Sequence, residues 1–204
     1  MTKQKIIKIA LNQLLLYGTE ECNIENISDR TGLCERSVRQ LFRDGNHELL
    51  MDAVEYAGRT WVQKLKKEVA GKEDVNSKLN VLTLGYALGG EQFPESLSVY
   101  IDLWKMVKDK KDTYIRNRLR ELYNFYTLEF SNIVNEIGDF DILQEGLKTY
   151  AFIMTLLSDV IHIQSIILEN EVDFQKIKKV IEIMTTAFFQ EVKEERAADG
   201  RSYE

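Results

Sequence analysis

A single proline, Pro94, in a chain of 204 residues most constrains what this sequence can fold into. Proline breaks helix interiors, so a chain that almost lacks it leaves long helices uninterrupted. Apolar residues make up 44% of the chain and charged residues 29%, the ordinary balance of a soluble globular protein. The sequence therefore predicts an all-α protein of one domain, or of two if one is small.

Charge is acidic overall but uneven along the chain. The formal net charge is −6, yet residues 1–67 hold 11 Lys and Arg against 9 Asp and Glu, while residues 68–204 hold 16 against 24. This distribution of charge excludes a protein whose whole surface is basic, but it permits a nucleic-acid contact near the N-terminus. Two cysteines without metal-binding spacing exclude a disulfide framework and favour a reducing cytosol, so we expect a cytoplasmic protein.

The N-terminal segment has apolar residues at helical spacing between Ile6 and Leu16, and this pattern stops at Gly18. Lysines followed by apolar residues are also typical of a signal peptide. Here the polar pair Asn12 and Gln13 divides the run, and no small-residue cleavage site follows. We therefore interpret the segment as an amphipathic helix.

Two short helices are predicted next. Asn23 is a good N-cap for a helix that turns Ile24 and Ile27 inward and ends at Gly32, and a third helix is expected from Glu35 to Phe42. The turn residues 44–46 then cap a longer helix. Two short helices joined by a tight turn, with a helix on either side, form the helix-turn-helix arrangement.

Breaks near residues 71–76, 89–94, 109–112, 138–141 and 170–173 separate five further helices. We expect three parts: a three-helix helix-turn-helix domain at 1–48 for DNA binding, a helical bundle at 49–195 for effector binding and dimerisation, and a flexible tail at 196–204.

The segment over 141–170 is apolar on every face: from Tyr150 to Leu168, thirteen of nineteen residues are apolar. A membrane span is the competing interpretation, but Asp159, His162 and Gln164 interrupt the run, and no second such segment exists. We expect a helix that packs on its own subunit by one face and on a partner by the other, and therefore a homodimer. The helix near 173–195 would supply the partner strip through Phe174, Ile177, Val180, Ile181, Met184, Ala187, Phe188 and Val192.

The stretch from Tyr17 to Leu50 resembles the DNA-binding segment of the TetR family of transcriptional regulators. Gly18, Ile27, Gly32, Phe42, Leu49 and Leu50 match the family pattern, and Asn23, Ser28, Thr31, Leu33, Cys34 and Ser37 are small or conservative replacements. The resemblance implies a homodimer that binds a double-stranded DNA operator, usually as a repressor. It also implies a C-terminal cavity for a small-molecule effector.

The sequence departs from the family where DNA is usually contacted. Arg39 stands where the family has Tyr, Leu41 stands where it has His, and residues 45–47 replace the usual Lys. The family uses that Tyr and that Lys for phosphate contacts. The alternative function is therefore an interaction protein that has kept the fold and lost specific DNA binding.

Arg36, Arg39 and Arg43 are three and four residues apart, which places them along one side of the predicted recognition helix and its exit. Arginine reads guanine bidentately and also binds phosphates. The alternative is a solvated charged face neutralised by Glu35 and Asp44. The predicted DNA-binding residues are Arg36, Ser37, Arg39, Gln40, Arg43, Lys3 and Lys5. In the dimer, two recognition helices would enter successive major grooves about 34 Å apart.

Aromatic residues are frequent in the C-terminal part, and most such residues belong to a core. By resemblance some would line the effector cavity, and the predicted ligand-binding residues are Tyr100, Trp104, Tyr123, Tyr126 and His162. Asp159 and His162 lie three residues apart and could instead bond to each other.

Catalytic and metal motifs are missing from the sequence. It has two histidines, no paired Glu-x-x-His motif, and no nucleophile or phosphate-loop signature, so we expect no enzyme activity, metal or cofactor. Cys22 and Cys34 are predicted at helix starts, where thiolates are favoured. We interpret both cysteines as small, semi-buried replacements for the Thr and Ser that usually cap these helices. The alternative is that they form a redox switch.

Overall fold

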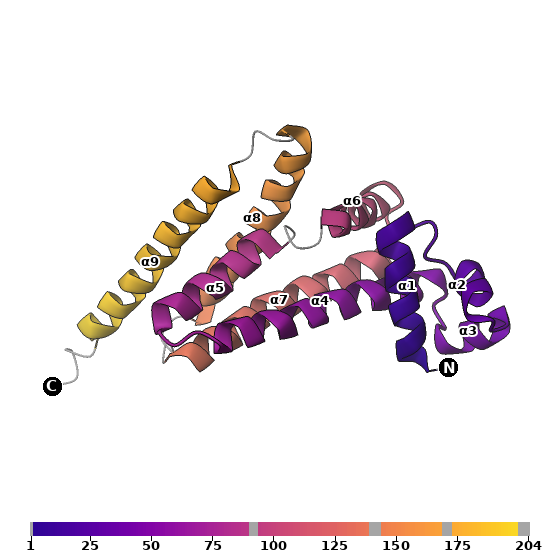
Figure 1. Ribbon diagram of the computed structural model, residues 1–204, viewed down its shortest axis with the longest axis horizontal. Helices are drawn as coiled ribbons and strands as arrows, with labels where there is room; N and C mark the ends of the chain where they lie inside the picture. The colour runs from indigo at the N-terminus through magenta and orange to yellow at the C-terminus, as the bar shows by residue number, and fades with distance from the viewer. Residues whose placement is uncertain (1, 90–93, 139–143, 169–172, 200–204) are drawn as a thin grey trace. The chain divides into compact units, whose positions relative to one another are not determined.

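The computed structural model describes residues 2–89, 94–138, 144–168 and 173–199; the side chains of residues 94–97, 144–145, 162, 165–168 and 192–199 lie outside the description. Within these ranges all regular structure is α-helical, and the predicted fold class is confirmed, including five helices after the fourth (Figure 1). The elements are α1 (Lys3–Tyr17), α2 (Ile24–Thr31), α3 (Glu35–Leu41), α4 (Asn46–Ala70), α5 (Val75–Leu88), α6 (Pro94–Asp109), α7 (Thr113–Ile137), α8 (Gln144–Leu168) and α9 (Phe174–Asp199).

Helix ends near the N-terminus follow the predicted caps. The side chain of Asn23 accepts a hydrogen bond from the backbone N–H of Asn26 at 2.9 Å and so begins α2. Gly32 ends α2 with a φ of +67°. This left-handed conformation costs a residue with a Cβ about 1–2 kcal/mol, so glycine is the residue that suits it.

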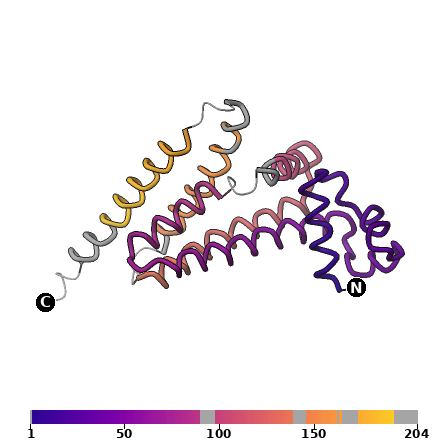
Figure 2. The backbone as a smooth tube through the Cα atoms, in the orientation of Figure 1, coloured from indigo at the N-terminus to yellow at the C-terminus, as the bar shows by residue number. Residues whose placement is uncertain are grey.

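The chain divides into two compact units, which can be followed along the trace in Figure 2. The first unit comprises Met1–Trp61 and Phe93–Tyr123, and the second comprises Val62–Gln92 and Asn124–Glu204. The long helices α4 and α7 each contribute to both units. This is a division by compactness; the functional boundaries at residues 48 and 195 stay a prediction.

The first unit is built on apolar residues that α1 to α4 turn toward one another. This core comprises Ile6, Ala10, Leu14, Ile24, Ile27, Val38, Phe42, Leu49, Leu50 and Ala53, all of which are buried. Thr19, just after α1, donates from Oγ1 to Asp102 Oδ2 on α6 at 3.0 Å. The three-helix segment is therefore fixed to α6 as well as to the start of α4.

The second unit has a core where α5 packs against α8 and α9. Tyr86 is buried on α5 and donates its hydroxyl to the carbonyl of Tyr126 at 2.8 Å. Tyr150 stacks on Phe188 with ring centroids 4.2 Å apart, and its hydroxyl lies 3.1 Å from Thr185 Oγ1. Burial of such aromatic rings, with their hydroxyls paired, contributes strongly to the stability of the bundle.

The α8 and α9 helices each bury one side and expose an apolar other side. On α8 the exposed residues are Phe152, Ile153, Leu156 and Val160, and on α9 they are Val180, Ile183 and Met184. One member of the predicted partner strip, Ile181, is buried within the chain, while Phe188 is half-buried and stacks on Tyr150. The strip as a dimer contact stays a prediction. None of the described helices combines the length and the apolar character that a bilayer span requires.

Candidate nucleic-acid interface

The α3 helix separates an apolar face from a polar one. Val38 and the capping residue Phe42 are fully buried against the rest of the first unit. Glu35, Arg36, Arg39, Gln40 and Arg43 are exposed, and Ser37 is half-buried. The predicted contact residues of this segment thus share a solvent-facing surface, apart from the partly covered Ser37.

The guanidinium of Arg39 is engaged within its own helix. Its Nη2 lies 3.1 Å from Glu35 Oε2, and the two side chains are 58% and 49% exposed. Exposed pairs at this spacing are worth about 0.3–0.5 kcal/mol. A DNA phosphate can therefore displace Glu35 at little cost. Arg36 and Arg43 form no ion pair with any described residue.

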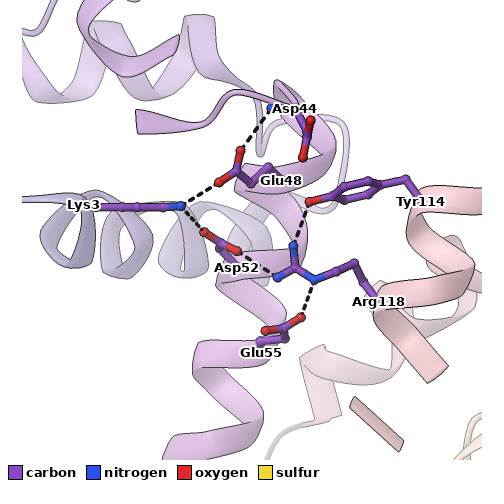
Figure 3. Close-up of polar contacts among 7 residues, drawn as sticks. All are labelled: Lys3, Asp44, Glu48, Asp52, Glu55, Tyr114 and Arg118. Carbon is purple, nitrogen blue, oxygen red and sulfur yellow. Dashed lines mark hydrogen bonds and ion pairs between the residues drawn. The ribbon is translucent and has the colours of Figure 1, made fainter. Parts of the chain in front are cut away.

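Lys3 and Lys5 differ sharply in their surroundings. Lys5 is exposed, whereas the Lys3 ammonium lies 2.7 Å from Glu48 Oε1 and 2.8 Å from Asp52 Oδ2 (Figure 3). It also lies 4.7 Å from the centroid of the Phe42 ring. Burial opposes its charge, but the two carboxylates outweigh that effect and raise the pKa of Lys3. Lys3 thus joins the start of α1 to α4, and its contact with DNA stays a prediction.

Arg118 on α7 extends this cluster. Its Nε donates to Glu55 Oε1 at 2.7 Å, its Nη2 donates to Asp52 Oδ1 at 2.9 Å, and its Nη1 donates to the Tyr114 hydroxyl at 2.7 Å (Figure 3). Burial disfavours the charged guanidinium, yet Glu55 and Asp52 raise the pKa of Arg118 above its ordinary value. The planar fork of arginine suits donation to several acceptors at once.

We name the group formed by Lys3, Glu48, Asp52, Glu55, Tyr114 and Arg118 the α4 cluster. Sequence reasoning missed it. A signal existed, because Glu48, Asp52 and Glu55 are four and three residues apart and so share one face of a helix. The sequence could not show which cations would meet that face, since Lys3 and Arg118 are distant along the chain.

His47 marks a second contact at the start of α4. Its Nδ1 lies 3.3 Å from Asp112 Oδ2, and the other carboxylate oxygen of Asp112 accepts from the backbone N–H of Ile115 at 2.9 Å. Asp112 therefore caps α7 and fixes the turn between α6 and α7 against the first turn of α4.

The two cysteines have opposite environments. Cys22 is buried, and burial raises the pKa of its thiol to about 12, so the expectation of a favoured thiolate there is wrong. Asn23, rather than Cys22, caps α2. Cys34 is exposed at the start of α3, and its hydrogen bond with Ser37, with the sulfur and oxygen 3.1 Å apart, lowers the pKa of its thiol.

The predicted ligand-binding residues fall in both units. Tyr100 and Trp104 lie on α6, with ring centroids 6.3 Å apart, and together with Tyr123 they belong to the first unit. Tyr126 belongs to the core of the second unit, and the side chain of His162 lies outside the described residues. Their role in ligand binding stays a prediction. No group of His, Cys, Asp and Glu suited to a metal ion occurs among the described residues.

Solved structures with a similar fold are transcriptional regulators. The fatty acid degradation regulator FadR from Bacillus halodurans is 12% identical with a TM-score of 0.64, and the match covers 90% of this chain and 97% of that one. FadR from Bacillus subtilis, solved in complex with stearoyl-CoA, is 11% identical with a TM-score of 0.63, over 90% and 97% of the two chains. A protein described as a transcriptional regulator from Pseudomonas aeruginosa PAO1 is 12% identical with a TM-score of 0.65, over 95% and 93%.

At these identities the likeness establishes the fold: an N-terminal helix-turn-helix segment followed by a helical domain. No family model matches the sequence, and no curated protein matches it.

Proposed function

We propose that this protein is a homodimeric transcriptional regulator of the TetR family that binds a DNA operator through α3 and is released from it by a small-molecule effector, as a repressor. The observation that carries the proposal is the polar face of α3. Buried Val38 and Phe42 fix the helix in the first unit while Arg36, Arg39 and Arg43 remain exposed. Arginines on such a helix can reach guanine edges and phosphates in the major groove.

The exposed apolar faces of α8 and α9 support the dimer. Seven large apolar residues at helical spacing remain exposed there, and apolar surfaces of this kind are typical of subunit interfaces. A twofold axis through these helices would present two copies of α3 to a near-palindromic operator.

An effector is supported by analogy with one structural neighbour and by the composition of the second unit. FadR from Bacillus subtilis was solved with stearoyl-CoA. The aromatic core around Tyr86, Tyr126 and Tyr150 offers the apolar walls that small-molecule sites use. A ligand acts as a switch only if it binds the two states of the protein with different affinity.

A gel-shift assay with the DNA that flanks the protein's own gene tests DNA binding. We expect a complex whose affinity falls as salt rises, with a slope of about −0.9 for each phosphate neutralised. Arg39→Ala should weaken the complex, whereas the exposed Lys72→Ala in the second unit should not. Equal affinity and salt slope for wild type and Arg39→Ala would remove Arg39 from the interface.

The second candidate is an interaction protein with this fold and no DNA binding. It is favoured by the pairing of Arg39 with Glu35 and of Lys3 with Glu48 and Asp52, because these bonds neutralise cations that DNA would otherwise use. A folded dimer that binds neither the flanking DNA nor any other duplex at low salt would decide in its favour.

A further inference from the structure

One segment of the first unit is far more basic than the chain that contains it. From Lys105 to Arg120 the sequence has seven Lys or Arg against two Asp, within a protein of net charge −6. The segment covers the end of α6, the turn at residues 110–112 and the first two turns of α7. Arg118 belongs to the α4 cluster, and the other six cations are exposed.

Most of these exposed cations lack an anionic partner. Lys105 lies 3.6 Å from Asp102, and Arg120 donates to Asn117 at 3.4 Å. Four further cations form no ion pair with any described residue, namely Lys108, Lys110, Lys111 and Arg116. Like charges held close together repel, so an anion bound among them is favoured.

The turn is held beside the end of the helix-turn-helix segment. Asp112 follows Lys110 and Lys111 directly and contacts His47 at 3.3 Å. His47 lies in the first turn of α4, four residues after Arg43 at the exit of α3. Tyr114 reinforces this placement, because its ring centroid is 6.3 Å from that of His47. The unpaired lysines therefore sit in the same compact unit as α3 and close to its exit.

The backbone of this turn favours a residue other than the one present. Lys111 has a φ of +53°, the one positive value of a residue other than glycine among the described residues. The conformation costs a residue with a side chain about 1–2 kcal/mol, and glycine or asparagine would relieve it. The turn is fixed by a hydrogen bond from the Asp112 N–H to the Met106 carbonyl at 3.2 Å. Lysine occupies a backbone position that suits glycine or asparagine, and this indicates that the positive charge of Lys111 has a function.

We infer that Lys110 and Lys111 of the turn, with Lys108 at the end of α6 and Arg116 in the first turn of α7, form a second DNA-contacting surface that binds phosphates of the duplex outside the bases met by α3. The inference rests on the proposed DNA-binding function. It commits to the sequence-independent phosphate backbone of double-stranded DNA, because these exposed cations share a unit with α3 and stand on a turn and the ends of two helices, not along one helix that could enter a groove.

Because phosphate contacts do not depend on sequence, a random-sequence duplex of about 30 base pairs is a sufficient probe. Fluorescence anisotropy between about 50 and 200 mM salt measures its affinity and salt slope for each variant. Lys110→Gln combined with Lys111→Asn removes two charges and suits the left-handed backbone. The matched control, Lys67→Gln combined with Lys72→Gln, removes the same charge from two exposed lysines of the second unit.

We expect the turn variant to lose about one unit of salt slope per contacting lysine and to bind about tenfold more weakly near 100 mM salt. The control should retain the wild-type slope. Thermal unfolding should show the turn variant to be at least as stable as wild type, because Asn suits the strained φ. Weaker DNA binding of this variant would then not be caused by unfolding. Arg116→Gln should reproduce part of the effect without touching the turn.

The outcomes separate this inference from the proposed function. If wild type binds and Arg39→Ala weakens binding while the turn variant keeps its slope, the second surface is wrong and the proposed function stands. If the turn and control variants lose equal affinity, net charge is the cause and the inference fails.

If polyglutamate competes for the protein as well as duplex DNA does at equal charge concentration, the turn binds an acidic protein and the inference fails. If wild type binds no duplex, the proposed function itself fails.

Discussion

Asp52 and Arg118 meet at 2.9 Å, and the same carboxylate carries Lys3 on its other oxygen at 2.8 Å. A single side chain of α4 thereby joins the first turn of α1 to the second turn of α7 (Figure 3). Two cations face three carboxylates and neutralise most of their charge, so the α4 cluster contributes through geometry more than through net attraction. Its effect is to fix the orientation of α1, and with it the helix-turn-helix segment, on α4.

Replacing Arg118 with Met should destabilise the first unit by about 2–3 kcal/mol, because it leaves Asp52 and Glu55 partly buried without their main donor. Arg118 is 21% exposed, so the cost falls below that of a fully buried pair. Urea unfolding measures it. Arg118→Lys retains the positive charge but loses the planar guanidinium, so its stability should lie between those of wild type and Arg118→Met. A loss of stability below about 0.5 kcal/mol for Arg118→Met would contradict this role.

Glu48 should make the protein sensitive to acid. Burial opposes its ionisation, but donation from Lys3 and from the backbone N–H of Asp44 outweighs this and lowers the pKa of Glu48 below its ordinary value. A lowered pKa stabilises the fold above the unfolded value, and that stabilisation is lost as pH falls through the folded value. Glu48→Gln should therefore lose stability near pH 7 and show a flatter fall in Tm below about pH 4.5 than wild type. Parallel Tm curves would exclude this contribution.

The fold was predictable because its signals are local. Asn23 and Gly32 specify the ends of α2 by capping and by a left-handed φ, and both effects depend only on neighbouring residues. The exposure of Arg36 follows in the same way from the helical spacing of buried Val38 and Phe42. Breaks rich in Gly, Asn and Asp placed the later helices for the same reason.

The partners of charged groups were not predictable, since they depend on tertiary contacts. The predicted contact of Lys3 with DNA stays a prediction, but the sequence did not show that its ammonium also pairs with Glu48 and Asp52. Cys22 was predicted at a helix start, where the pKa of a thiol is lowered. Burial, which depends on tertiary packing, raises the pKa of Cys22 instead. The cluster of lysines around residues 105–111 can be read from the sequence, but its position near the exit of α3 follows only from tertiary contacts of His47 with Asp112 and Tyr114.

Cys34 and Cys22 should react at very different rates with iodoacetamide near pH 8. The exposed Cys34 has a lowered pKa, whereas the pKa of buried Cys22 is about 12. Because the thiolate is the nucleophile, mass spectrometry should find one label in the native protein, on Cys34, and two after denaturation. Ser37→Ala should slow the labelling of Cys34 by removing its hydrogen bond. Equal labelling of both cysteines in the native protein would contradict the burial of Cys22.

Ile183 tests the exposed face of α9 as the dimer contact. It is 60% exposed, and Leu128 on α7 in the same unit is 53% exposed, so the two give matched substitutions. Ile183→Glu would bury an unpaired charge in the proposed interface and should weaken the dimer by about 2 kcal/mol or more, while Leu128→Glu should leave it intact. Sedimentation at several protein concentrations measures both. If neither variant dissociates, the α9 face is not the contact; if both do, the interface extends to α7.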